Sequence, residues 1–273
     1  MKFIHRLQKA QQNNNSLLCV GLDIDPARLP QHLRSTGNPV VQFNRRIIEA
    51  TCDLVCAYKL NLAFYEALGE RGWQSLQQTL AYIPAGVVTI GDGKRGDIGN
   101  SSERYAKAIF DGFGFDGATV HPYMGYDSVE PFLRYEDRGT FLLVLTSNEG
   151  SSDFQRLTFG GKPFYQKVVQ AAVRWNTRKN IGLVVGATHP EELLPVRKLA
   201  GEMPILIPGI GKQRGDVESA VRYGCNKKGL LAIINASRSI IYASNGKDFA
   251  TAARKEATRL RSKIAKYQEE FFD

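Results

Sequence analysis

Short apolar runs rich in β-branched residues recur along the chain, separated by longer segments in which apolar residues repeat at helical spacing. The short runs predict buried strands and the periodic segments predict amphipathic helices. Strands that are apolar along nearly their whole length indicate a parallel sheet covered on both faces. The predicted strands are SLLCVGLD from Ser16, CAYKLNLAF from Cys56, AGVVTIGD from Ala85, GATVHPY from Gly117, TFLLVLTS from Thr140, IGLVVGAT from Ile181, MPILIPGIG from Met203 and LLAIINAS from Leu230.

This alternation predicts an α/β protein, a (β/α)8 TIM barrel formed as a single domain by residues 1–273. Eight βα units close naturally into a barrel, and such barrels typically have roughly 250 residues. An open, doubly wound sheet is the alternative fold. Polar residues favour the barrel, because Asp23, Asp92 and Arg238 lie at or just beyond predicted strands, and the carboxyl ends of barrel strands converge on one site.

Composition narrows the functional classes. No apolar run approaches the roughly 18 residues that span a bilayer, and polar QKAQQNNN stands where a signal peptide has its apolar core. We therefore expect a cytoplasmic protein without a membrane partner. The net charge of +9 would suit nucleic acid or a small anion, but the charges are scattered and no RNA motif or zinc finger accompanies them, so no nucleic-acid partner is expected. The four cysteines form no CxxC pair, so neither a disulfide framework nor a zinc site is predicted.

The run DGKRGDIG holds the most informative charges, Asp92, Lys94 and Asp97. Side chains two apart on a strand point the same way, so Asp92 and Lys94 can both face the barrel mouth, and Asp97 follows in the turn. A helix is expected to begin near Asn100 or Ser101. Two carboxylates beside one ammonium should keep the lysine charged and in place, which predicts a fixed proton donor. Taken alone, the pattern is also typical of a salt-bridge cluster that ties loops together.

The loops after the last two predicted strands have features of a phosphate site. The glycines of PGIG, from Pro208, let the backbone approach a ligand closely. Arg238 can bind a phosphate through two parallel hydrogen bonds. In many barrels of this class the phosphate lies at these two loops. PGIG alone could equally be a strand-ending turn, and only together with Arg238 does it favour phosphate.

Seven sequence blocks in order resemble the orotidine 5′-phosphate decarboxylase family, in particular its longer bacterial branch. The resemblance covers nearly the whole chain, and several blocks in order are far more specific than one DxKxxD match. The blocks are GLDIDP at Gly21, YKLNLAFYE at Tyr58, DGKRGDIGNSS at Asp92, VHPYMG at Val120, LTSNEGS at Leu145, PGIGKQRGD at Pro208 and NASRSIIYA at Asn235.

The resemblance implies decarboxylation of orotidine 5′-phosphate to UMP and CO2, the last step of pyrimidine nucleotide synthesis, without a cofactor or a metal. It implies that Lys94 protonates C6 of the pyrimidine and that Asp92 lies beside the departing carboxylate. It also implies a homodimer with shared active sites, in which Asp97 reaches into the neighbour's site. The substrate-binding residues expected from it are Asp23 and Lys59 at the ribose or the charged network, Ser101, Ser147 at the pyrimidine, and Gln213 and Arg238 at the phosphate.

One departure from the family pattern concerns the polar stretch NEGSSDFQRLTFGGKP from Asn148, which is interpreted as a mobile loop over the site. The branch usually has proline where this chain has Glu149. The change affects the expected stiffness of the loop more than the chemistry. His121 and His189 each precede a proline and are interpreted as residues of loop structure rather than acid–base or metal groups.

Two other functions are alternatives to this one. A magnesium-dependent phosphosugar lyase or decarboxylase shares the barrel and a similar DxKxxD element, but such relatives hold magnesium through an acidic residue at the end of strand 2. This chain has Lys59 there, and an ammonium would repel a divalent cation. A basic, noncatalytic binding protein would be expected to have lost the Asp92, Lys94 and Asp97 constellation, which is complete here.

Overall fold

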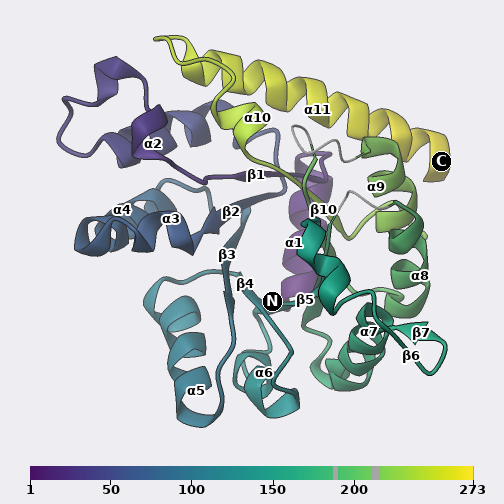
Figure 1. Cartoon of the computed structure of the whole chain (residues 1–273). Coiled ribbons are helices and arrows are strands. Elements are labelled where there is room, and N and C mark those ends of the chain that lie inside the picture. Colours follow the sequence, from purple (N-terminus) through teal and green to yellow (C-terminus); the bar gives the residue numbers. More distant parts are fainter. Residues whose placement is uncertain (187–189, 211–215, 273) are drawn as a thin grey trace.

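The computed structural model describes residues 1–186, 190–210 and 216–272. Within these ranges, eight parallel strands form a closed barrel in the order β1-β10-β9-β8-β5-β4-β3-β2 (Figure 1). The predicted α/β barrel is therefore confirmed, and each predicted strand overlaps one of the eight. The strands are β1 (Leu18–Gly21), β2 (Ala57–Asn61), β3 (Val88–Arg95), β4 (Gly117–Val120), β5 (Gly139–Leu145), β8 (Ile181–Val185), β9 (Ile205–Pro208) and β10 (Ala232–Ala236).

Helices connect the strands and surround the barrel (Figure 1). Caps fix where some of them begin: the Asn38 side chain accepts a hydrogen bond from Val41 N, and Asp216 accepts from Glu218 N and Ser219 N. None of the helices in the described ranges is both long and apolar enough to cross a membrane. The helices are α2 (Pro39–Thr51), α3 (Leu62–Glu66), α4 (Gly69–Ala81), α5 (Gly99–Lys107), α6 (Tyr126–Leu133), α7 (Phe164–Trp175), α8 (Pro190–Ala200), α9 (Val217–Gly224), α10 (Arg238–Ile241) and α11 (Phe249–Phe272).

A helix before the first strand, α1 (Phe3–Asn13), closes the amino-terminal end of the barrel, and Figure 1 shows it within the ring of strands. The Phe3 ring packs edge-on against Phe141 of β5, with centroids 5.5 Å apart. It fits because residue 139 is glycine: a Cβ there would lie 2.7 Å from the Phe3 ring. Both ends of the buried Gln11 amide bond the backbone, at Ala232 O and Leu231 N. Although its sequence is polar overall, α1 therefore forms an apolar plug at the amino-terminal end of the barrel.

Inside the barrel, apolar side chains fill the layers next to this plug. Burying them removes apolar surface from water, which is the main stabilising contribution in a protein of this kind. On most of the strands they alternate with outward-facing residues that pack under the helices. The inward residues are Cys19, Ala57, Val88, Ile90, Phe141, Val184, Leu206, Leu231 and Ile233.

The stretch after β5 has more local structure than the sequence indicated. It contains a short 3-10 helix, Glu149–Asp153, and a two-stranded hairpin of β6 (Thr158–Phe159) and β7 (Lys162–Pro163). Gln155 ties this stretch to the barrel, since its Oε1 accepts from Thr146 N at 2.7 Å. Arg156 pairs with Glu192 of α8 at 2.8 Å. The segment leading away from Ser147 is therefore anchored at two points.

Candidate active site

A cavity of about 350 Å³ opens at the carboxyl ends of the barrel strands. Cavities of this size hold small organic molecules. One side is apolar and the other carries the charged and amide groups, so the cavity can hold a molecule with a flat ring and polar substituents. The lining residues are Asp23, Lys59, Asn61, Asp92, Lys94, Leu143, Leu145, Thr146, Ser147, Asn148, Val184, Leu206, Pro208, Gly209, Ile210, Asn235, Ser237, Arg238 and Ser239.

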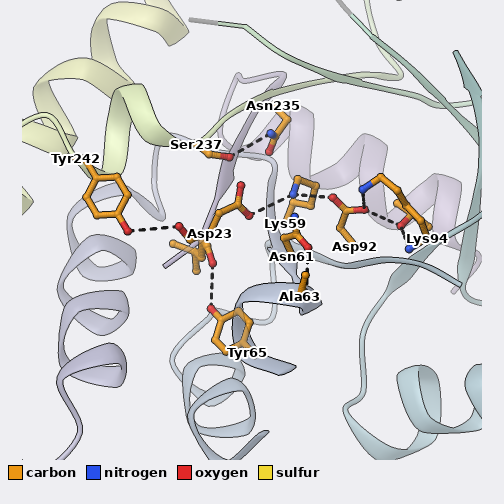
Figure 2. Close-up of polar contacts among 12 residues, drawn as sticks. Asp23, Lys59, Asn61, Ala63, Tyr65, Asp92, Lys94, Asn235, Ser237 and Tyr242 are labelled. Atoms are coloured by element: carbon orange, nitrogen blue, oxygen red, sulfur yellow. Dashed lines mark hydrogen bonds and ion pairs between the residues drawn. The ribbon is translucent and has the colours of Figure 1, made fainter. Parts of the chain in front are cut away.

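Four charged side chains form a chain of ion pairs along one wall of the cavity (Figure 2). Lys59 Nζ lies 2.9 Å from Asp92 Oδ2 and 3.4 Å from Asp23 Oδ1. Lys94 Nζ lies 2.7 Å from Asp92 Oδ1. The Lys59 side chain is only 4% exposed, whereas that of Lys94 is 42% exposed. Both lysines line the cavity, but Lys59 is held within the ion-pair network and Lys94 is the more accessible ammonium.

The charges within this network stabilise one another. Burial alone would lower the pKa of Lys59, but the charges of Asp23 and Asp92 outweigh it and hold that pKa above its ordinary value. Burial alone would raise the pKa of Asp92, but Lys59 and Lys94 outweigh it and hold that pKa well below its ordinary value. Asp92 is therefore a carboxylate and Lys59 an ammonium throughout the physiological pH range.

The backbone of β3 deviates where it carries this network. The register between β3 and β4 shifts between Gly91 and Arg95, and Lys94 has a φ of 44°, in the left-handed region that side chains other than glycine rarely adopt. Thr119 of β4 compensates: its hydroxyl accepts from Lys94 N at 2.9 Å and donates to Asp92 Oδ1 at 2.8 Å. Asp92 and Lys94 do face the same cavity, as expected, but an irregular strand rather than simple alternation brings them there.

Two tyrosine hydroxyls hold the backbone on either side of Asp23 (Figure 2). Tyr65 of α3 donates to Leu22 O at 3.1 Å. Tyr242, directly after α10, accepts from Asp25 N at 2.7 Å and donates to Asp23 O at 3.4 Å. Because α10 begins with Arg238 and Tyr242 follows its last residue, the two ends of one short helix place the cavity's arginine and a support for Asp23.

The structure brings six of the nine site residues expected from the sequence to this cavity: Asp23, Lys59, Asp92, Lys94, Ser147 and Arg238. Gln213 lies outside the described residues, as does His189. The ring of His121 packs against Gly96, where a Cβ would lie 2.0 Å from its Nε2, and this fits the interpretation that His121 serves loop structure.

Asp97 and Ser101 do not line the cavity of their own chain. Asp97 is half-buried and accepts a hydrogen bond from the adjacent Ile98 N at 2.8 Å. Ser101 is exposed on α5, which begins at Gly99, close to the expected start near Asn100 or Ser101. The expectation that Lys94 has two carboxylate partners is not met among the described residues of one chain. The lysine between two carboxylates is Lys59, because it is buried between the ends of β1 and β3.

Sequence reasoning missed several residues of the cavity. Asn61 and Asn235 stand at the ends of β2 and β10, and Ser237 and Ser239 flank Arg238. Their positions at strand ends were visible in the sequence, but uncharged side chains gave no chemical signal there. None of the described residues forms a cluster of three or more His, Cys, Asp or Glu side chains that could hold a metal ion.

Comparison of the sequence with protein families shows to which family the chain is related. Residues 16–253 match the model of the "Orotidine 5′-phosphate decarboxylase / HUMPS family". The chain belongs to this family. An orotidine 5′-phosphate decarboxylase of Dehalococcoides mccartyi (strain BAV1) is 52% identical over 99% of this chain and 100% of its own length. One of Herpetosiphon aurantiacus is 50% identical over 93% of this chain and 95% of its own.

Solved structures of the family agree with the barrel. The chain is similar to the OMP decarboxylase of Leishmania donovani, with a TM-score of 0.87 and 36% identity over 98% of this chain and 99% of that one. It is also similar to the UMP synthase of Leishmania donovani, with a TM-score of 0.84 and 37% identity over 96% of this chain but 57% of that one. The charged wall described above therefore lies in a family barrel that is matched over nearly its full length.

Proposed function

We propose that this protein decarboxylates orotidine 5′-phosphate to UMP and CO2 in the cytoplasm, as the last step of pyrimidine nucleotide synthesis. The observation that carries the proposal is the accessible Lys94 ammonium, held 2.7 Å from the buried Asp92 carboxylate at the mouth of the barrel. The decarboxylases of Dehalococcoides mccartyi and Herpetosiphon aurantiacus support it by their similarity over almost the whole chain. So does the UMP synthase named above, of which this barrel matches a part.

The chemistry requires a charge near one carbon atom. When the C6–carboxylate bond breaks, the electron pair stays on C6 in an orbital in the plane of the ring, so the ring cannot delocalise it. The Lys94 ammonium stabilises the developing carbanion electrostatically and then gives it a proton, while CO2 leaves; solvent returns a proton to the lysine. Asp92, held between Lys59 and Lys94, keeps the ammonium aimed at C6. No cofactor is needed for these steps.

The remaining groups orient the nucleotide. Arg238 binds the phosphate together with the backbone around Gly209, and Gln213 adds a contact there. Asp23 and Lys59 bind the ribose hydroxyls, and Ser147 binds the pyrimidine. The phosphate lies far from the reacting carbon, so its binding energy can be used to align C6 with Lys94.

Asp97 and Ser101 complete the site of a second copy in a symmetric homodimer. Their exclusion from the cavity of their own chain supports this assignment. Exposed apolar side chains in the segments that follow the neighbouring strands β2, β3 and β4, among them Ile98 at 56% and Tyr123 at 79% exposure, support a protein contact on that side. Further exposed apolar residues there are Phe64, Tyr105 and Met124.

The reaction is tested with purified protein, orotidine 5′-phosphate and EDTA, by following the loss of the substrate's ultraviolet absorbance. Turnover with EDTA present is expected, because the proposed steps use no metal. No turnover at all would overturn the proposal. Turnover only after magnesium is added would also overturn it, because the proposed steps need no divalent cation.

The shared site is tested by mixing Lys94→Ala with Asp97→Ala protein, each inactive alone. A mixed dimer has one site with both defects and one site with none, so statistical mixing should restore activity in about one quarter of all sites. Coexpressing the two variants forms mixed dimers even if purified dimers do not exchange subunits. If neither mixing nor coexpression restores activity, the shared site is wrong while the reaction itself still stands.

A further inference from the structure

Asn235 carries a buried hydrogen-bond acceptor that nothing in the described chain satisfies. The residue is 5% exposed and is the second-last residue of β10, and its Oδ1 has no hydrogen-bond partner among the described residues. Its Nδ2 makes one long contact, 3.4 Å, with Ser237 Oγ (Figure 2). Leaving a buried acceptor without a partner costs free energy, so such a group calls for an explanation.

The place of this acceptor distinguishes it from the other buried polar atoms that lack a partner in the described structure. Those atoms belong to Asn44, Arg95, Thr140 and Asn180, and none of these residues lines the cavity at the barrel mouth. Asn235 does line it. A ligand in the cavity can therefore supply the hydrogen-bond donor that Asn235 Oδ1 lacks.

The neighbours of Asn235 indicate which part of a ligand would reach it. Asn235 pairs with Cys19 of β1, and its Oδ1 lies 3.3 Å from where a Cβ on Gly21 would be, so the close approach depends on that glycine. Three residues further along the chain is Arg238, and Lys59 lies on the far side of β1 (Figure 2). Asn235 thus stands on the floor between the arginine and the ion-pair network.

Resting on the proposed function, we infer that Asn235 binds the substrate by accepting a hydrogen bond from a ribose hydroxyl. With the phosphate at Arg238 and C6 at Lys94, the sugar spans the floor where Asn235 lies. At neutral pH the phosphate and the carboxylate have no proton to donate to an amide oxygen, whereas each ribose hydroxyl has one. Asn235 therefore recognises a hydroxyl of the ribose, and a nucleotide that lacks this hydroxyl leaves Asn235 Oδ1 unpaired.

The test compares Asn235→Leu with the wild type as binders of UMP, 2′-deoxy-UMP and 3′-deoxy-UMP, measured by calorimetry. The wild type should bind one of the two deoxy nucleotides about tenfold more weakly than UMP, and Asn235→Leu should bind UMP about tenfold more weakly than the wild type does. The two effects should not add: wild type and variant should bind that deoxy nucleotide equally well.

Stability of the unliganded protein gives a second measurement. Leucine removes the unsatisfied acceptor, so the midpoint of thermal unfolding of Asn235→Leu should equal or exceed that of the wild type. Asn180→Leu is the matched control, because Asn180 also has an unpaired Oδ1 but uses its Nδ2 to bond Leu133 O and Tyr135 O, away from the cavity. It should lower the midpoint and leave the discrimination among the three nucleotides unchanged.

Three outcomes overturn the inference: unchanged UMP binding by Asn235→Leu, equal weakening of all three nucleotides, or a lowered midpoint like that of Asn180→Leu. Equal weakening would assign the acceptor to the base or to the fold. A wild type that neither binds UMP nor turns over orotidine 5′-phosphate would instead refute the proposed function. The two failures are therefore distinguishable.

Discussion

The two ends of the barrel are made by the same strands but differ in polarity. Along β3 the inward side chains change from Val88 and Ile90 to Asp92. From Leu231, just before β10, they change through Ile233 to Asn235. At the amino-terminal end α1 seals an apolar interior. At the carboxyl end the same rows continue into charges and amides around an open cavity.

Along the barrel axis, residues that stabilise the fold therefore lie mainly at one end and residues of the candidate site at the other. The plugged end is closely packed, and its buried Asp116 is paired with Arg6 and Arg138. Both ends have features that cost stability, but at the open end these features line the cavity: Lys94 has a positive φ, and Asn235 keeps an unpaired acceptor. A functional site is expected to retain such costs, because the groups are arranged for a ligand rather than for each other. Substitutions at the two ends should therefore have opposite signatures.

The largest effect is expected from Lys94→Ala. Removing the ammonium that we propose stabilises the carbanion and protonates it should lower kcat by about 10⁴-fold or more, with little change in unfolding free energy, because this side chain is partly exposed. The ultraviolet assay and urea unfolding measure the two quantities. Lys255→Ala, at an exposed position of α11, is the control and should leave both unchanged. Substantial turnover by Lys94→Ala would remove this lysine from the mechanism.

Lys59→Met should be the most destabilising change at the open end. It leaves Asp92 buried with one cation fewer, and breaking a buried ion pair in this way costs about 3–5 kcal/mol of unfolding free energy at neutral pH. The sign of the pH dependence follows from the lowered pKa of Asp92 in the wild type. Its charge contributes stability above about pH 4, which is lost as the pH falls further.

In Lys59→Met the pKa of Asp92 should rise, so the carboxylate can take a proton at mildly acidic pH. The stability difference from the wild type should therefore be largest near neutrality and shrink as the pH falls toward about 5. Urea unfolding at several pH values measures it. A difference that is constant with pH would show that lost packing, rather than charge, dominates.

Phe3→Ala tests the plugged end. Removing a ring buried against Phe141 leaves a cavity and should lower the free energy of unfolding by about 3 kcal/mol. The kcat of the folded enzyme should stay within about twofold of the wild type, since the plug lies at the far end of the strands. A fall in kcat comparable to the loss of stability would contradict the separation of the two ends.

The smallest effect is expected from Tyr242→Phe, which keeps the ring and removes the hydroxyl beside Asp23. Losing a net contribution of about 1 kcal/mol from these hydrogen bonds should raise KM several-fold. In an Asp23→Asn background the same change should have less effect, because Tyr242 acts through that aspartate. Tyr58→Phe is the control: its buried hydroxyl bonds Thr51, away from the cavity. Equal changes in KM for both tyrosine variants would point to a general loss of packing.

The eight strands could be predicted because a covered parallel strand is apolar along nearly its whole length. The plug could not, since α1 is polar overall and only a few of its residues, such as Phe3 and Leu7, carry its buried face. The hairpin at Thr158–Phe159 and Lys162–Pro163 was missed because such short strands have no readable periodicity.

The charged part of the site could also be predicted, because acidic and basic residues at strand ends stand out in the sequence. The geometry could not: the positive φ of Lys94 and the buried bridging position of Lys59 depend on the neighbouring strands. Asn235 and the supporting Tyr65 and Tyr242 gave no signal, since asparagine and tyrosine are common in any barrel. Their roles follow from burial and from hydrogen bonds between distant segments.

The plug formed by α1 also determines by which end of the barrel substrate can enter and products can leave. Phe3 and its neighbours fill the amino-terminal end of the barrel, so the described structure is open only at the carboxyl ends of the strands. In the proposed reaction, CO2 released above Asp92 must leave through the same mouth that admitted the nucleotide. Substrate and products therefore use the same opening. The order in which CO2 and UMP leave depends on how quickly the groups around Ser147 and Arg238 release the nucleotide.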